Sequence, residues 1–373
     1  MTAVNAGTAV RLLVTGIGGA VGSGLADALA AAPPWAEVVG VFSGERSRDA
    51  FRERSSEAVR NRIRPVVRDL TDGPATLSLA GELGPADRTL VVHAAANVSW
   101  TASLEGARRG NVEVTRNVAE LARALGGDTR FVYVSSAYTA VEGWEYRNTY
   151  EATKAEAERL LRSDYGDLRP VVFSCSLVVG HSRTGAISRF HGIYPLLGLI
   201  DRHEPPLLPG GRDRRIDIVP VDWVAAELAA LLSRLAHGDG GPASDVVASS
   251  GTAAPRLEEL VAGAVAALNR ARVHAERPPV RELTLVPFRR WEFLRRSLDA
   301  WQVRGIPMPP KAFLDRLIGV YRPYFEDDRV LPPTGTVRPC PPWTEFLEPA
   351  VGYWFARQPV RGGGALVRTG GAG

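Results

Sequence analysis

The chain has 373 residues, of which 45% are hydrophobic and 23% are charged, as in ordinary soluble globular proteins. Its net charge of +4 is small for this length, and no basic block with interleaved aromatic residues dominates, so the composition argues against nucleic acid as a partner. Two cysteines, Cys175 and Cys340, exclude a disulfide framework and a CxxC metal site. The six histidines show no paired ligand spacing, so no metal is expected.

No run of residues approaches the roughly 18 apolar positions that a spanning helix needs. The first residues, "MTAVNAGTAVRLLVTG", lack the basic and apolar regions of a signal peptide. We therefore expect a cytoplasmic protein with no membrane partner. The glycine-rich end, 361–373, predicts a disordered tail.

The first half of the chain alternates β-rich runs with helical patterns. Strands are predicted at 10–16, 36–43, 63–70, 88–96, 129–137 and 169–180, and helices at 23–32, 110–125 and 148–163. Such alternation is typical of a parallel sheet that right-handed crossovers cover with helices on both faces. The sequence therefore predicts an α/β fold with a Rossmann-type, doubly wound parallel sheet, which binds ligands at the carboxyl ends of its strands.

The pattern changes after residue 180. One further strand and helix, within 214–232, are expected to return to the sheet. We predict a Rossmann-type NAD(P)-binding domain and a smaller, mixed C-terminal substrate-binding lobe; the first is assigned 8–180 and 216–250, the second 181–215 and 251–360.

A glycine-rich loop, "VTGIGGAVGSG", follows the first predicted strand and opens the first predicted helix. Gly16, Gly19 and Gly22 suit a tight turn, close approach of a diphosphate and close helix packing. After the second strand come Ser43, Arg46 and Arg48, and the nearest acid is Glu45. A hydroxyl and arginines suit a 2′-phosphate, which favours NADPH over NADH; two solvated loop arginines are the alternative.

Tyr150 and Lys154 stand four residues apart on one predicted helix, and so they share a helix face. The chain has 45 lysines and arginines, and only Lys154 and Lys311 are lysines, so this position needs an ammonium rather than a generic positive charge. A nearby ammonium is expected to lower the tyrosine pKa for proton transfer. Ser136, at the end of the fifth strand, can polarise the same substrate oxygen.

The motifs "TGIGGAVG", "HAAANVSW", "NVEVT", "FVYVSSAY", "YEATK", "SLVVGHSRTG" and "DIVPVDWVA" occur in one order. With them the chain resembles the extended short-chain dehydrogenases/reductases. Its closest likeness is to the male sterility-type branch of fatty acyl-CoA reductases and thioester reductases. The resemblance implies catalytic Ser136, Tyr150 and Lys154, with Asn111 supporting a proton relay.

The remaining expected contacts fall into two groups. The cofactor-binding set is Thr15, Gly16, Gly18, Gly19, Ala20, Val21, Gly22, Ser43, Arg46, Arg48, Asp69, Leu70, His93, Ala94, Ala95, Ala96, Asn111, Tyr150, Lys154, Cys175, Leu177 and Val178. The substrate-binding set is Asn97, Ser136, Ala137, Tyr138 and Tyr194.

Four positions depart from the family pattern. Val114 replaces a glycine, Ser174 and Cys175 replace Arg-Pro, and His181 replaces an acid. The expected function is NAD(P)H-dependent reduction of a carbonyl in a relatively apolar, biosynthetic substrate. Thioester reduction to an aldehyde, an NAD-dependent epimerase and a non-enzymatic cofactor-sensing regulator remain open. A homodimer, and an acyl carrier protein docking on the arginines of 288–301, are further candidate partnerships.

Overall fold

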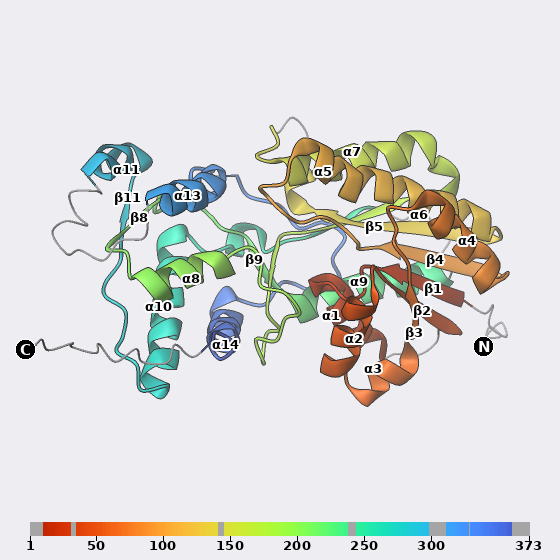
Figure 1. The fold of residues 1–373 in the computed structure, drawn as a ribbon, viewed down its shortest axis with the longest axis horizontal. Coiled ribbons are helices and arrows are strands. Elements are labelled where there is room, and N and C mark those ends of the chain that lie inside the picture. The colour runs from red at the N-terminus through yellow and green to blue at the C-terminus, as the bar shows by residue number, and fades with distance from the viewer. Residues whose placement is uncertain are drawn as a thin grey trace, which may run out of the picture.

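The computed structural model describes residues 10–30, 35–140, 145–237, 244–297, 311–327 and 329–359. The expected tail at 361–373 lies outside these residues. The sheet and its covering helices form one side of the molecule, and a mostly helical C-terminal part forms the other (Figure 1).

The main sheet has seven strands, and every neighbouring pair is parallel. Across the sheet they are β10 (Val246–Ala248), β6 (Val171–Cys175), β5 (Asp128–Ser136), β4 (Arg88–His93), β1 (Val10–Thr15), β2 (Glu37–Phe42) and β3 (Arg64–Val67). The chain builds outward from β1 in both directions, which leaves a crevice at the carboxyl ends of β1 and β4. The predicted α/β fold is thereby confirmed.

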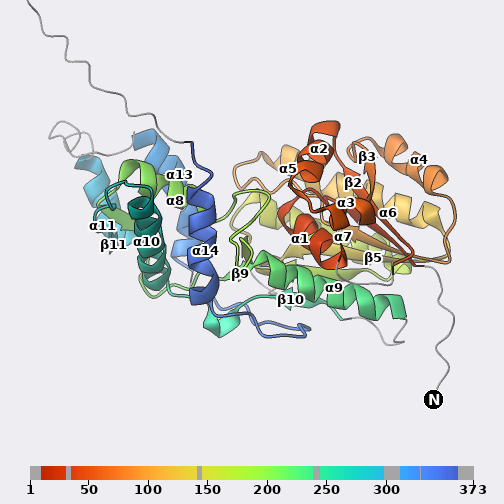
Figure 2. The ribbon, with the colours of Figure 1, turned by 90° about the horizontal axis from the view of Figure 1, so that it is seen from below.

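Helices cover both faces of the sheet (Figure 2). One face is packed by α1 (Ala20–Ala30), α2 (Glu45–Arg54), α3 (Glu57–Arg62) and α9 (Val221–His237). The other face is packed by α4 (Gly73–Leu83), α6 (Val114–Leu125) and α7 (Thr149–Asp164). Because the sheet is buried on both sides, the middle residues of its central strands are apolar and fully buried, as in Leu12 to Val14 of β1 and Leu90 to Val92 of β4.

Two sequence predictions in the second half of the sheet were wrong. The strand expected at 169–180 divides after Cys175, where the Ser176 amide donates to the Ala248 carbonyl at 3.1 Å. The chain then leaves the sheet as β7 (Leu177–Val179), which pairs with β9 (Ile218–Pro220) in a separate two-stranded sheet. The strand within 214–232 therefore does not return to the main sheet, and the short β10 takes that edge instead.

The C-terminal part has its own apolar core. It is built from α8 (Tyr194–His203), β8 (Leu207–Pro209), α10 (Leu257–His274), β11 (Thr284–Val286), α11 (Phe288–Leu294), α13 (Lys311–Phe325) and α14 (Trp343–Phe355). Trp100 and Tyr138, which follow β4 and β5, pack against this core from the sheet side. The domain boundaries assigned from the sequence stay a prediction.

The helix expected at 110–125 begins earlier and is not regular. A short helix, α5 (Leu104–Arg108), leads into a π-helical turn at Arg109–Glu113 and then into α6. Turns of this kind are often found at functional sites. This one carries Asn111 into the protein interior.

Backbone packing explains two glycines of the loop after β1. Gly16 has φ +70°, and a Cβ there would stand 2.5 Å from the Ala95 amide nitrogen. At Gly22 a Cβ would stand 2.4 Å from the Gly16 carbonyl oxygen. Both positions need glycine because the loop folds tightly against β4 and the first turn of α1.

We expect Gly22→Ala to destabilise the fold by roughly 1–3 kcal/mol, because the added methyl meets backbone atoms that cannot move aside. Gly81→Ala is the matched control: this glycine also lies in a helix, and a Cβ there would meet nothing within 4 Å. That control should stabilise the chain by about 0.5–1 kcal/mol. Urea unfolding measures both, and equal effects would contradict the packing argument.

Candidate active site

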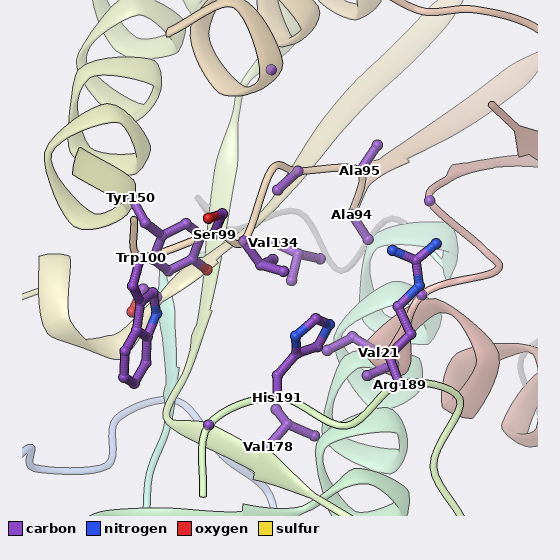
Figure 3. A pocket seen from close by; sticks show the side chains of 18 of the residues that line it. Val21, Ala94, Ala95, Ser99, Trp100, Val134, Tyr150, Val178, Arg189 and His191 are labelled. Carbon is purple, nitrogen blue, oxygen red and sulfur yellow. The ribbon is translucent and has the colours of Figure 1, made fainter. Parts of the chain in front are cut away.

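A cavity of about 1160 Å³ lies at the carboxyl ends of the strands, between the sheet and the C-terminal part. Figure 3 shows Tyr150, Ser99 and Trp100 on one side and Val21, Arg189 and His191 on the other. The glycine loop, the end of β2, the segment after β4 and helix α7 all contribute to its walls. Residues 187–195 and α13 complete the walls from the C-terminal side.

Most of the residues expected to form the site are brought together in this cavity. Those in its lining are Gly16, Gly18, Gly19, Ala20, Val21, Gly22, Ser43, Asp69, Leu70, Ala94, Ala95, Ala96, Ser136, Tyr138, Tyr150, Lys154, Cys175, Leu177 and Val178. They come from distant parts of the chain, and the sheet register explains their meeting. Ser136 and Cys175, for example, are directly paired at the ends of β5 and β6.

Thr15 and His93 lie beneath the cavity rather than in its lining. The Thr15 hydroxyl and His93 Nδ1 are 2.7 Å apart, and His93 Nε2 is 3.1 Å from the Thr115 hydroxyl. Burial lowers the pKa of His93 to about 3, with a smaller contribution from Lys154. A neutral imidazole therefore ties β1 and β4 to α6, and the cofactor contact expected of His93 stays a prediction.

Asn111 also supports the cavity from behind. Its Oδ1 accepts the Asn97 amide at 2.7 Å, and its Nδ2 donates to the Asn97 carbonyl and, at 2.9 Å, to the Thr153 hydroxyl. These bonds connect the segment after β4 to helix α7. The structure thus engages Asn111 in positioning two cavity walls, and its support of a proton relay stays a prediction.

The expected 2′-phosphate arginines lie outside the lining. The Arg48 guanidinium pairs with Glu45 and, at 2.8 Å, with Asp49. Arg46 is exposed on the same helix. Ser47, which the sequence analysis missed, lines the cavity with Ser43. Its position one helical turn after Ser43 is the only signal that the sequence offered.

Three of the expected substrate residues also lie outside the lining. Ala137 is fully buried, and the Asn97 backbone is held by Asn111. The Tyr194 hydroxyl accepts the Gly180 amide at 2.9 Å, so it fixes the end of β7.

Lys154 is almost completely buried, at 1% exposure. Its Nζ donates to the Val134 carbonyl at 2.6 Å and lies 3.8 Å from the centre of the Tyr133 ring. Burial lowers the pKa of Lys154 to about 7, and Glu158 opposes that shift. The ammonium is therefore held in place, but it is close to losing its proton at neutral pH.

Tyr150 differs from expectation in its acidity. Burial raises the pKa of Tyr150 above its usual value, and Cys175, Glu151 and Glu158 act in the same direction. In the chain alone, burial of the phenol thus raises its pKa, instead of the lowering that was expected from Lys154. Tyr150 is thus a protonated phenol, the form that can donate a proton.

A neutral thiol and a buried acid complete this wall. Burial raises the pKa of Cys175 to about 12, so the thiol is not an activated nucleophile. The Glu158 carboxylate accepts hydrogen bonds from the hydroxyls of Ser135 and Thr139, the latter at 2.6 Å. Ser135 lines the cavity, so Glu158 holds a polar edge beside Ser136.

An aromatic wall was largely missed by the sequence analysis. Trp100 stacks on Tyr324 with ring centres 4.5 Å apart, and Tyr138 meets Tyr324 edge-on at 5.5 Å. Arg147 lies 4.1 Å from the Tyr138 ring and 4.0 Å from the Tyr324 ring. Of these aromatic residues, Tyr138 was expected in the substrate site, and it does line the cavity. No local pattern pairs residues so far apart in sequence.

Residues 42–144 and 142–228 match the family model described as "Male sterility protein", an NAD-binding family. The match runs over half of the 373 residues. The chain therefore belongs to this family, within the extended short-chain dehydrogenases/reductases, as its motifs indicate. No curated protein sequence matches the chain.

Solved structures support the same fold. The chain is similar to the terminal R domain of the myxalamid PKS-NRPS pathway, with TM-score 0.67 and 18% identity over 95% of this chain and 92% of that one. It is also similar to the thiolation-reductase di-domain of an archaeal non-ribosomal peptide synthetase, with TM-score 0.66 and 16% identity over 94% of this chain and 76% of that one. A third similar structure is the UDP-glucose 4-epimerase of Thermus thermophilus in complex with NAD, with TM-score 0.60 and 20% identity over 93% of this chain and 100% of that one.

We expect Lys154→Met to raise the free energy of unfolding at neutral pH by roughly 1–2 kcal/mol, because methionine has no ammonium to desolvate. Between pH 7 and 10.5 the unfolded lysine binds more protons than the folded one, so wild-type stability rises with pH. The gap between variant and wild type should shrink across that range. Urea unfolding at about pH 6.5 and about pH 9.5 measures it; a gap that does not narrow would contradict this prediction.

Proposed function

We propose that the chain is an NAD(P)H-dependent reductase that converts a carbonyl of a relatively apolar substrate to an alcohol. One observation carries the proposal: Ser136, Tyr150 and Lys154 line the same cavity as the glycine loop after β1. A proton donor, a polarising hydroxyl and a dinucleotide site thereby share one enclosed space.

The cavity fits a dinucleotide cofactor along its length. Asp69 and Leu70 line the end expected for adenine, and the glycine loop meets the diphosphate at the start of α1. Tyr150, Lys154 and Leu177 line the end expected for nicotinamide. A bound reduced nicotinamide supplies the hydride that a carbonyl carbon accepts.

The side chains of the chain divide the remaining work. Tyr150 donates its proton to the carbonyl oxygen as charge develops there, since burial keeps the phenol protonated. The Ser136 hydroxyl donates a hydrogen bond to the same oxygen. Lys154, fixed by the Val134 carbonyl, provides the ammonium that stabilises the tyrosinate after transfer and donates to ribose hydroxyls.

The walls beyond these residues favour an apolar substrate. Trp100, Tyr138, Tyr321 and Tyr324 line this end with Leu317 and Val320. Aromatic and aliphatic surfaces bind apolar groups by removing them from water. The chemical identity of the substrate is tested by a cofactor-oxidation screen of ketones, aldehydes and acyl thioesters.

We also propose NADPH as the preferred cofactor. Ser43 and Ser47 line the cavity at the first turn of α2, and the β2 end carries Phe42 instead of an acid. The nearest acid in the sequence, Glu45, is paired with Arg48. A dissociation constant for NADH at or below that for NADPH would overturn the preference.

Reduction of an acyl thioester to an aldehyde is the second candidate. The likeness to two reductase domains from peptide and polyketide synthesis favours it. The substrate of this reaction would be an acyl group carried as a thioester by coenzyme A or an acyl carrier protein. Release of a free thiol with cofactor oxidation would identify this reaction. Epimerisation would instead convert substrate with no net cofactor turnover.

Cellular location and assembly are part of the proposal. Among the described residues no helix is long and apolar enough to cross a membrane. We propose a cytoplasmic protein that acts alone or as a homodimer. Cell fractionation and light scattering test these two points.

We expect Tyr150→Phe to lower turnover by about 10²- to 10⁴-fold, because the variant has no proton to donate. Cofactor affinity should stay within a few fold of wild type. Tyr321→Phe is the matched control, since its hydroxyl lies in the same cavity but donates to the Gly192 carbonyl. Steady-state cofactor oxidation measures both. Full activity of Tyr150→Phe, with intact cofactor binding, would refute the mechanism.

A further inference from the structure

The segment between β7 and α8 returns from the C-terminal part to the glycine loop. Arg189 and His191, from this segment, line the same cavity as Gly18, Gly19 and Val21. In Figure 3 the side chains of Arg189 and Val21 lie next to one another at one end of the cavity. The cavity thus meets a guanidinium on the side that faces the first turn of α1.

This segment is fixed on either side of Arg189. Near its start, the Ser182 amide and hydroxyl donate to the Asp222 carboxylate at 2.7 and 2.6 Å. Next to Arg189, the Phe190 ring packs 5.0 Å from Tyr194 and 6.3 Å from Tyr353. Arg189 is therefore presented to the cavity from an anchored backbone.

Positive charge gathers here, and the Asp27 carboxylate offsets part of that of Arg54. Within the residues that the structure describes, Arg189 forms neither an ion pair nor a hydrogen bond. Its neighbour Arg54 donates to the Gly18 carbonyl at 2.8 Å. Burial, and then the charge of Arg189, lower the pKa values of both Arg54 and His191. Like charges that repel one another are expected where an anion binds between them.

We propose that Arg189 binds the diphosphate of the dinucleotide cofactor, from the side opposite the N-terminus of α1. This inference rests on the proposed function, and it adds a binding residue from outside the sheet. The backbone N–H groups of α1 and its positive dipole end meet one side of the diphosphate. A guanidinium fork matches phosphate oxygens on the other side.

The chemistry distinguishes this position from the 2′-phosphate end. Ser43 follows β2 and Ser47 lies in the first turn of α2, whereas Arg189 lies beside Val21, a residue of the first turn of α1. Binding through the diphosphate is common to NADH and NADPH. Arg189 should therefore strengthen both cofactors and should not decide between them.

The test is equilibrium binding, measured by cofactor fluorescence and by displacement with nucleotide fragments. We expect Arg189→Met to weaken NADPH, NADH and ADP by about 10- to 100-fold, the loss of one charge-assisted bond. Adenosine 2′-monophosphate, which has no diphosphate, should bind as it does to wild type. Arg189→Lys should recover part of the affinity because it keeps the charge. Arg183→Met is the matched control, an exposed arginine of the same segment outside the lining.

Each other outcome overturns the inference. If Arg189→Met weakened the binding of NADPH and adenosine 2′-monophosphate but not of NADH and ADP, Arg189 would be assigned to the 2′-phosphate. Unchanged binding of all four nucleotides, with wild-type binding intact, would refute this inference and leave the proposed function standing. Wild-type protein that binds neither dinucleotide would refute both.

Equal thermal unfolding midpoints of the two methionine variants would exclude a folding defect.

Discussion

The hydrogen bond from Lys154 Nζ to the Val134 carbonyl, at 2.6 Å, fixes helix α7 to strand β5. Among the residues that the structure describes, no carboxylate forms an ion pair with this buried ammonium, and burial lowers its pKa to about 7. A buried ammonium of this kind lowers the free energy of unfolding, and such destabilising groups are typical of functional sites. Its place determines where Tyr150 stands, one helical turn earlier, and therefore where a substrate oxygen must lie.

Two parts of the molecule meet around this lysine. The sheet contributes the glycine loop, Ser136 and the segment held by Asn111. The C-terminal part contributes Tyr324 of the aromatic wall and, in our proposal, the arginine that faces the diphosphate. Arg147 connects them, because it pairs with Glu151 on α7 and with Asp327 after α13, each at 2.9 Å. Cofactor and substrate can thus be bound between parts that are already joined.

From the sequence alone, site residues can be predicted where they belong to one short motif. The glycine loop, Tyr150 and Lys154 were found because each pattern lies within a few residues, and the fold followed from regular alternation. Tertiary effects were not visible. Arg48 is paired with neighbouring acids. The strand predicted at 169–180 divides at Cys175, and the edge strand that pairs with it in the main sheet is β10. Trp100 and Arg189 depend on segments distant in sequence, so no local pattern marks them.

The most direct test of this account is the turnover of Lys154→Arg at saturating cofactor, with cofactor oxidation as the readout. Arginine keeps the positive charge, but its planar, larger head cannot occupy the buried position that donates to the Val134 carbonyl. We predict that turnover falls by at least about 10²-fold, while the secondary structure of the variant stays that of the wild type. Near-normal turnover would show that any cation suffices, and it would contradict the assignment of Lys154 as the residue that organises the site.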